Sequence, residues 1–269
     1  MSGVTKYKAS FLVGVTQSME YRFDFFLNLL STVFPIIMQI FLWIAMYSGS
    51  GMDAMYGYTF PQMIMYVVVA GAVSKFTSTG IEYTVNEDIH SGGLAKFITK
   101  PVNYILFRLT GAIGLKSSAM FTMFVLTVVS VFVLYFVVGL PIQLAAILLF
   151  IPSLLLATIL NFYIFFCIST LAFWLTEIGN FFHAISVVIM VLSGGVFPVS
   201  IFGPEFEMIA KYIPLTYTIN YPIQILAGKV LPGAALKVIG IQLVWIITLM
   251  LLAKLMWRRG LKKYVAVGG

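Results

Sequence analysis

Six long apolar runs constrain this chain more than any other feature of its sequence. They cover residues 25–48, 60–82, 115–138, 142–172, 179–198 and 234–257. A helix needs about 20 apolar residues to cross the hydrocarbon core of a bilayer, and each run reaches that length. The runs lack the alternation of apolar and polar residues that membrane strands require. We therefore expect an all-α membrane protein with six transmembrane helices.

The composition agrees with a membrane protein of one domain. Of the 269 residues, 61% are hydrophobic and 9% are charged, whereas soluble domains carry about 25% charged residues. The length suits a single transmembrane domain over residues 1–269, with little sequence left for an enzyme domain. The first residues lack the apolar core and cleavage site of a signal peptide, so the first span is expected to direct targeting. Cys167 lies inside an apolar run and is interpreted as a small buried hydrophobic residue.

The positions of the basic residues predict how the helices are oriented. One set lies before the first span, in or beside the second connection, or after the last span: Lys6, Lys8, Arg22, Lys96, Lys100, Arg108, Lys116, Arg258, Arg259, Lys262 and Lys263. The opposite side receives Lys211, Lys229 and Lys237. Because positive charge favours the cytoplasmic side, both termini and the connection 83–114 are expected to be cytoplasmic. This topology explains the net charge of +7, so no nucleic-acid partner is expected.

Residues 5–22 are expected to form an amphipathic helix. Tyr7, Phe11, Val15 and Met19 recur at four-residue intervals, which places them on one helix face. Such a helix lies in the cytoplasmic membrane interface. It would serve as an anchor or as a lever linked to the first span.

A polar segment, NEDIHSGGLAKFITKPVN at 86–103, separates the second and third spans. Asn86 is expected to cap a short helix, with Glu87 and Asp88 in its positively polarised first turn. Gly92 allows a tight turn, after which a second short amphipathic piece ends at Pro101. We interpret the segment as a docking element for another protein. A structured loop packed only on its own bundle is the alternative.

The stretch 198–230 is expected to form short external helices between the fifth and sixth spans. Five of the ten prolines fall in or beside it: Pro198, Pro204, Pro214, Pro222 and Pro232. Their spacing excludes a 20-residue helix. One helix is expected to begin at Pro204, and a second to run from after Leu215 to Gly228 with a bend or interruption at Pro222. We interpret them as a re-entrant pair that dips into the outer leaflet, with a folded external loop as the alternative.

No motif for catalysis or metal binding is present in the sequence. There is no HExxH or GxSxG pattern, and the two histidines lie apart. The segment GAIGLKS fails as a phosphate loop because Leu115 separates Gly114 from Lys116. We therefore expect no enzyme activity, metal or cofactor in this chain. Lys75 and Glu82, seven apart in the second span, share a face; Lys75 either lines a substrate path or extends to the interface.

At two blocks the sequence resembles the permeases of ABC-2-type exporters, in particular the six-span subunits of drug and antibiotic export. The first block is the segment 86–103, similar to the family's Glu-x-x-Ile-x-x-Gly-x-Leu…Leu-x-x-Pro pattern, although His90 stands where the family often has Arg. The second is LSGGVFPVSIF…IAKYIPLTYTINYPIQILAG. The resemblance covers nearly the whole chain. It implies a prokaryotic multi-pass protein of the plasma (inner) membrane.

The resemblance also implies partners. Permeases of this family pair as dimers, with an identical or a homologous second permease, among membrane lipid. Each binds a separate cytoplasmic ATPase subunit, which carries the ATP and Mg²⁺. The segment 86–103 would then contain the coupling helix in a groove of that ATPase. The residues implied for this contact are Glu87, Asp88, Ile89, His90, Gly92 and Leu94.

The same resemblance suggests a route for the substrate. Candidate residues for the path are Phe34, Pro35, Gln39, Phe41, Lys75, Phe162 and Phe166. Candidates for an external gate are Phe197, Pro198, Pro214 and Tyr217. With 16% aromatic residues, the path would suit an amphipathic, hydrophobic or lipid-like substrate. Packing against lipid or within the bundle is the alternative role of each aromatic residue.

Two other functions remain open at the level of sequence. One is a secondary carrier that works without an ATPase, although buried acids and an internal repeat are not evident. The other is a non-transporting membrane subunit used in assembly or sensing. A co-purifying subunit with a phosphate loop would distinguish the exporter from both.

Overall fold

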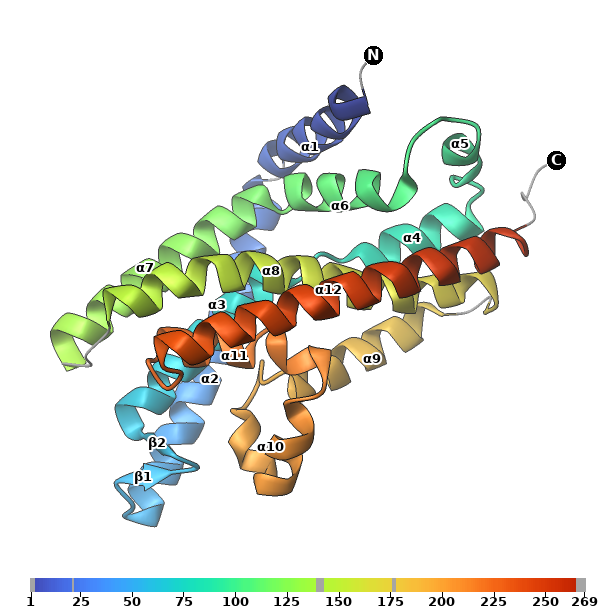
Figure 1. Ribbon diagram of the computed structural model, residues 1–269. Helices are drawn as coiled ribbons and strands as arrows, with labels where there is room; N and C mark the ends of the chain where they lie inside the picture. The colour runs from blue at the N-terminus through green and yellow to red at the C-terminus, as the bar shows by residue number, and fades with distance from the viewer. Residues whose placement is uncertain (1–2, 21, 139–142, 176–177, 265–269) are drawn as a thin grey trace.

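The computed structural model describes residues 3–20, 22–138, 143–175 and 178–264, which are mainly helical (Figure 1). The α-helices are α1 Gly3–Glu20, α2 Arg22–Ser50, α3 Phe60–Thr77, α4 Ile81–His90, α5 Ala95–Ile98, α6 Tyr104–Leu115, α7 Ser117–Val138, α8 Leu144–Ser169, α9 Gly179–Leu192, α10 Pro204–Ala210, α11 Asn220–Leu226 and α12 Pro232–Leu261. The 3-10 helices are η1 Thr170–Phe173, η2 Val199–Phe202 and η3 Pro214–Tyr217, and the strands are β1 Ala54–Met55 and β2 Tyr58–Thr59.

Four helical segments among the described residues are long and apolar enough to cross a membrane. They are Val33–Ser50, Phe60–His90, Leu144–Phe173 and Pro232–Leu261. A fifth is obtained if Tyr104–Leu115 and Ser117–Val129, which are bent by 51°, form one span. The expected span at 179–198 contains α9, which has 14 residues and is shorter than the hydrocarbon core at about 1.5 Å per residue. The chain is a multi-pass membrane protein, and the number six stays a prediction.

Helix α8 lies at the centre of the bundle. It packs against α12, α3, α4 and α11, and its side chains at Phe162 and Phe166 are fully buried. A buried polar contact fixes this packing: Gln242 of α12 donates from Nε2 to the carbonyl oxygens of Ser153 (3.1 Å) and Tyr217 (2.9 Å). Ser153 Oγ donates back to Gln242 Oε1 at 3.1 Å. Because lipid offers no alternative partner, such bonds hold α8, α12 and η3 in register.

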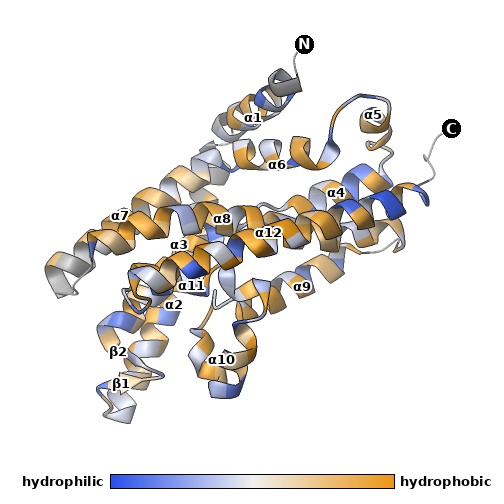
Figure 2. Ribbon diagram, viewed as in Figure 1, coloured by the Kyte–Doolittle hydropathy of each residue, from blue (hydrophilic) through white to orange (hydrophobic). Residues whose placement is uncertain are grey.

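The two ends of the molecule differ in structure. One end holds α5 and the last turn of α12, and we call it the α5 end; the other holds β1, β2 and α10, and we call it the hairpin end (Figure 1). Hydrophobic residues run along the long helices, and hydrophilic residues gather at α4 and at the last turns of α12 (Figure 2). β1 and β2 pair antiparallel, with Ala54 opposite Thr59. The connection between the first two candidate spans is therefore a hairpin.

The N-terminal helix packs mainly against α6. Its contact face carries small residues: a side chain added at Gly14 would lie 2.6 Å from the backbone nitrogen of Leu115, and one at Gly114 would lie 2.2 Å from the carbonyl oxygen of Phe11. Ser10 Oγ donates to the carbonyl oxygen of Phe107 at 3.0 Å. Close backbone approach of this kind is typical of membrane helix pairs with small residues. The structure thus has a helix, α1 Gly3–Glu20, where one was expected over 5–22, and its place in the membrane interface stays a prediction.

The predicted apolar stripe of this helix is only partly packed. Tyr7 is half-buried and accepts a hydrogen bond from the Asn103 backbone N–H at 3.2 Å. Phe11 is 37% exposed and Val15 is half-buried. The side chain of Met19 lies outside the described part of the structure. The stripe is therefore available to lipid, while the small residues beside it hold the helix to α6.

The stretch 198–230 forms the short pieces that its prolines predict. Helix α10 begins at Pro204, and Gly228, with φ +68°, follows α11. The expected second helix, however, is split into η3 and α11 at Thr218 and Ile219. The expected interruption therefore lies just before Pro222 rather than at it, and this proline occupies the first turn of α11, where its missing N–H breaks no helical hydrogen bond.

Candidate functional site

A tight turn joins α4 to α5 at the α5 end. Gly92 has φ +75°, which favours glycine, and the backbone N–H of Leu94 donates to the carbonyl oxygen of Asp88 at 2.8 Å. The backbone N–H of Ala95 donates to the carbonyl oxygen of Gly92 at 3.1 Å and starts α5. Leu94 and Ile89 are buried beneath the turn. The turn is thus a folded unit, as the sequence predicts.

The expected helix start at Asn86 is wrong. Helix α4 begins at Ile81, after Gly80 with φ +65°, so Asn86 lies in the middle of the helix. Glu87 and Asp88 accordingly lie in its second half rather than in its first turn. Because the helical backbone is broken at 78–80, α4 begins directly after the break, at Ile81. This is earlier than the capping preference of Asn86 indicates.

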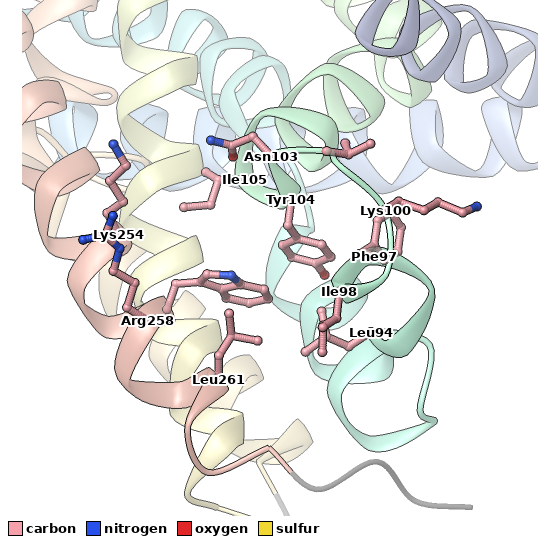
Figure 3. A pocket seen from close by; sticks show the side chains of 12 residues that line it. Leu94, Phe97, Ile98, Lys100, Asn103, Tyr104, Ile105, Lys254, Arg258 and Leu261 are labelled. Atoms are coloured by element: carbon pink, nitrogen blue, oxygen red, sulfur yellow. The ribbon is translucent and has the colours of Figure 1, made fainter. Parts of the chain in front are cut away.

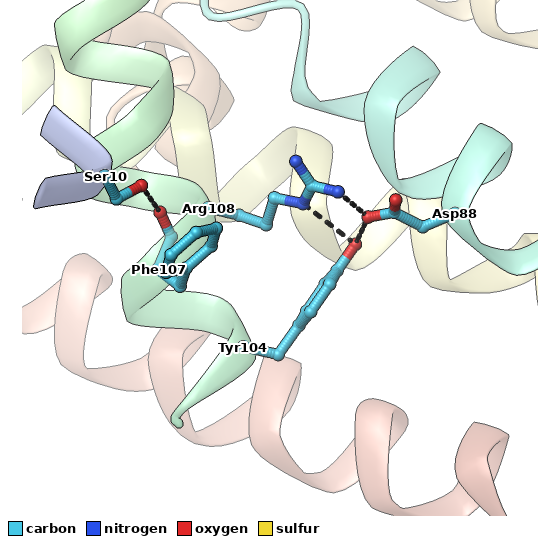
Figure 4. A network of polar contacts seen from close by, with 5 residues as sticks. All are labelled: Ser10, Asp88, Tyr104, Phe107 and Arg108. Atoms are coloured by element: carbon cyan, nitrogen blue, oxygen red, sulfur yellow. Dashed lines mark hydrogen bonds and ion pairs between the residues drawn. The ribbon is translucent and has the colours of Figure 1, made fainter. Parts of the chain in front are cut away.

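A polar network anchors the turn to α6 (Figure 4). Asp88, which is buried, forms an ion pair with Arg108 and accepts a hydrogen bond from the Tyr104 hydroxyl. Arg108 Nε donates to the same hydroxyl oxygen at 3.3 Å. The Arg108 guanidinium also lies over the Phe97 ring of α5, 5.0 Å from its centroid. The carboxylate, the guanidinium and the phenol satisfy one another, and α4, α5 and α6 are joined.

Aromatic stacking extends the network into the bundle. The Tyr104 ring stacks on Trp257 of α12 with centroids 4.4 Å apart and planes at 9°. Trp257 also contacts Phe166 of α8 (5.5 Å) and Phe173 of η1 (5.3 Å). The turn is therefore linked to α12 and α8 through one phenol ring.

A cavity of about 370 Å³ lies beside this network. Side chains of α5, including Phe97 and Ile98, face Lys254 and Arg258 of α12 across it (Figure 3). Lys100 also lines the cavity. The cavity separates α5 from the last turns of α12 and leaves room for the two to approach each other.

The six predicted coupling residues divide by exposure. Glu87 and His90 are exposed, and Gly92 forms the turn. Asp88, Ile89 and Leu94 are buried within this chain. Of the six, only Glu87 and His90 therefore expose a side chain to the surroundings, and the buried group packs beneath the turn.

The predicted path residues do not form one surface. Phe34 and Phe41 of α2 are each 62% exposed, whereas Phe162 and Phe166 are buried in α8 and stack on each other at 5.8 Å. Pro35 is exposed and Gln39 is half-buried on α2. Lys75 Nζ donates to Ser31 Oγ of α2 at 3.4 Å. The structure thus assigns Phe162 and Phe166 to core packing and leaves the α2 residues on an open face.

The predicted gate residues lie near the hairpin end. Phe197 meets Trp43 edge to face at 6.4 Å, and Pro198 beside it is buried. Pro214 opens η3. The Tyr217 hydroxyl donates to the Lys211 carbonyl oxygen at 2.8 Å.

Lys229 holds the same segment to the hairpin. Its Nζ donates to the carbonyl oxygen of Gly57 at 2.6 Å and lies over the Tyr58 ring. Desolvation lowers the pKa of Lys229 to about 8, although the charge of Glu207 opposes this shift. The hairpin and the stretch 198–230 therefore form one packed unit.

Sequence reasoning missed Tyr104, Arg108 and Trp257 as parts of the site. Tyr104 and Arg108 are four residues apart in a helix, so they share a face beside the acidic segment, and this spacing was a usable signal. No signal of this kind links Trp257 to them, because that contact spans the chain. The small residues Ser10 and Gly14, also four apart, were a signal for the α1 contact.

The comparison with known families agrees with this arrangement. The family model described as ABC-2 family transporter protein matches residues 33–268, which is most of the chain. The matched region contains the turn, the network and every candidate span. No curated protein and no solved structure matches the chain. The chain belongs to the ABC-2 family of transporter proteins.

Proposed function

We propose that this chain is the membrane-spanning permease of an ATP-driven exporter, and that a separate cytoplasmic ATPase subunit supplies the energy. The family match supports a role in transport. In this proposal the ATPase subunit binds and uses ATP and Mg²⁺, while this chain forms the path. The cargo is an amphipathic or hydrophobic molecule, such as a drug, an antibiotic peptide, a lipid-like or a glycan-type compound.

The observation that carries the proposal is the connection between the α4–α5 turn and the bundle. The exposed residues Glu87 and His90 are available to a partner, and the network behind them links the turn to α12 through Tyr104. A partner that binds the turn differently in two states biases the helices by its differential contact energy. This is how an ATPase outside the membrane drives a permease inside it.

The charge distribution supports a cytoplasmic α5 end. Lys96 and Lys100 lie on or beside α5, and Arg258 and Arg259 lie in the last turn of α12. Lys6 of α1 reaches the same end, where its Nζ donates to the Pro101 carbonyl oxygen at 3.3 Å. Positive charge favours the cytoplasmic side. We therefore place both termini in the cytoplasm and the hairpin outside, in a plasma (inner) membrane of a prokaryote.

The open face of α2 supports a second permease. Only 11% of the window Val33–Ser50 is buried within this chain, and Phe34 and Phe41 are among its most exposed residues. A dimer with an identical or homologous permease covers this face, and lipid covers what remains. The predicted path then runs between the two copies.

Co-purification tests the proposal. The tagged chain is extracted gently from its native membrane, and the proteins that come with it are identified by mass spectrometry. A subunit with the Gly-x-x-x-x-Gly-Lys-Ser/Thr motif is expected in the wild type. The double variant Glu87→Lys/His90→Glu is expected to lose it, because both substitutions reverse or add charge on the exposed side of α4. Glu205→Lys, on exposed α10 at the opposite end, is the matched control and is expected to retain it.

Two results would contradict the proposal. A chain that purifies alone and moves solute without ATP would be a secondary carrier. A chain that purifies with other membrane proteins but moves no solute would be an assembly or sensing subunit.

A further inference from the structure

A cavity of about 440 Å³ lies where the second candidate span is broken. The backbone leaves the helical conformation at Ser78 and Gly80, between α3 and α4, although Phe60–His90 counts as one span. Residues of α3, α4, α8 and α9 line the cavity. Broken backbone at membrane depth is tolerated where it is buried in protein or lines a polar cavity. The break and the cavity therefore belong together.

Four polar side chains with unsatisfied atoms line this cavity. Ser74 Oγ, Thr79 Oγ1, Glu82 Oε2 and Asn161 Oδ1 are buried, and each lacks a hydrogen-bond partner within the described residues. They make up four of the seven buried side-chain atoms of this kind in that part of the chain. Buried polar groups are normally paired, and an unpaired carboxylate is especially costly. Such a concentration in one cavity indicates a group that is bound there.

Glu82 indicates which charge the bound group carries. Its side chain is 6% exposed, and within the described residues the one ion pair joins Arg108 to Asp88, which leaves Glu82 without a paired cation. Glu82 also lies in the first turn of α4, where the helix dipole favours a negative charge. Lys75 lines the cavity edge, but its Nζ donates to Ser31 on α2. The cavity is thus lined by one carboxylate and several oxygen acceptors, together with the imidazole of His183 on α9.

Part of the remaining wall is apolar, although His183, Ser186 and Ser193 also line the cavity. Phe165 of α8, with Ile189 and Met190 of α9, lines the same cavity. Aromatic and methionine side chains accommodate apolar bodies of varied shape. An ammonium group carries only hydrogen-bond donors and a positive charge, which matches the acceptors and the carboxylate.

We propose that this cavity binds an amphipathic amine, with its ammonium group on Glu82 and Asn161 and its apolar body against Phe165 and Met190. The inference rests on the proposed transport function and names the substrate class as amphipathic cations. Ser74 and Thr79 accept the remaining N–H donors. Each of the four polar side chains then gains the partner that the described residues do not supply.

Equilibrium binding to the purified chain in lipid nanodiscs, without any ATPase, tests this inference. The probe is dansylcadaverine, which joins a fluorescent apolar body to a primary ammonium, and its N-acetyl derivative is the neutral control. Fluorescence anisotropy is expected to show saturable binding of the amine and at least tenfold weaker binding of the acetylated form. Glu82→Gln keeps the side-chain size and is expected to weaken amine binding at least tenfold. Glu205→Gln, on exposed α10, is expected to leave it unchanged.

The comparison of the amine with its N-acetyl derivative on the wild-type chain keeps the test decisive if Glu82→Gln folds poorly, and a second variant tests the position of the charge. Asn161→Asp returns a carboxylate to the same cavity, so Glu82→Gln/Asn161→Asp is expected to regain most of the lost amine affinity. Equal binding of both probes, or amine binding by Glu82→Gln at the wild-type level, would overturn the inference.

Failure of the inference is distinguishable from failure of the proposed function. The Glu87→Lys/His90→Glu variant is expected to bind the amine normally, since its changes lie outside the cavity. If the purified chain binds the amine but no ATPase subunit co-purifies with it from native membranes, the exporter proposal is overturned and the binding site is kept. An ATPase partner together with amine binding that does not depend on Glu82 would overturn the site and keep the exporter.

Discussion

At the scale of single residues, the account depends on how charge is held in apolar surroundings. Asp88 and Arg108 are paired and share the Tyr104 hydroxyl, whereas Glu82 is buried and has no paired cation among the residues that the structure describes. Buried pairs are costly to break because the remaining charge is left uncompensated. The Asp88–Arg108 pair is therefore structural. Glu82, by contrast, is the position to which we assign a ligand.

Breaking the pair is expected to destabilise the turn. Asp88→Ala leaves the Arg108 guanidinium without its carboxylate, and we expect a loss of about 3 kcal/mol in the free energy of unfolding. Asp88→Ala/Arg108→Met removes both charges and is expected to recover much of that loss. Unfolding by SDS titration in mixed micelles measures both. A single variant as stable as the wild type would show that the pair does not anchor the turn.

Lys229 gives the hairpin end a dependence on pH. Its pKa of about 8 lies below the ordinary value of 10.5, so between these pH values the unfolded chain binds a proton that the folded chain has released. The stability of the folded state relative to the unfolded state therefore rises with pH across this window. We expect the difference in Tm between wild type and Lys229→Met to shift in favour of the wild type from pH 8 to 10.5. A difference that is flat or falls over this range would contradict the assignment.

At the scale of elements, α1 and α6 are held by glycines rather than by the apolar stripe. A side chain at Gly114 would overlap the carbonyl oxygen of Phe11, so no rearrangement of flexible atoms relieves the contact. Beside this crossing, the hydroxyl oxygens of Ser18 on α1 and Ser117, the first residue of α7, lie 3.3 Å apart. The pair α1–α6 is thus a close crossing that a single substitution can open.

The fraction of molecules that form an engineered disulfide measures whether α1 stays close to α6 and the start of α7. Ser18→Cys and Ser117→Cys are expected to cross-link under mild oxidation, because their side chains already meet. Adding Gly114→Leu is expected to reduce the cross-linked fraction at least fivefold. Gly240→Leu, at a position with open space, is the matched control and is expected to have no effect. Undiminished cross-linking in Gly114→Leu would mean that α1 docks by another face.

At the scale of the whole molecule, the sequence predicts what depends on local rules. Long apolar runs, the start of α10 at Pro204 and the turn at Gly92 follow from hydropathy and backbone preferences. The break at 78–80 overrides the local capping preference of Asn86, which therefore lies within α4. The stacking of Tyr104 on Trp257 joins residues 153 positions apart in a packed bundle, and no local pattern encodes it.

The same limit applies to the predicted path. Aromatic residues on α2 and α8 are alike in sequence, but packing buries Phe166 and leaves Phe34 exposed. Burial depends on which helices surround a position, and α8 is surrounded while α2 lies at the edge. The polar cavity could be anticipated only in part, from the shared face of Lys75 and Glu82. Asn161, which lines the same cavity, lies on α8, far from Lys75 and Glu82 in the sequence.

Site-specific photo-cross-linking tests the central claim most directly. A photoreactive amino acid replaces Glu87 on the exposed side of α4, or Glu205 on α10 as the control, and native membranes are irradiated. The account predicts that position 87 cross-links to a subunit with a phosphate-loop motif and that position 205 does not. Cross-linking of position 87 only to lipid or to this chain, with ATP-independent transport retained, would contradict it.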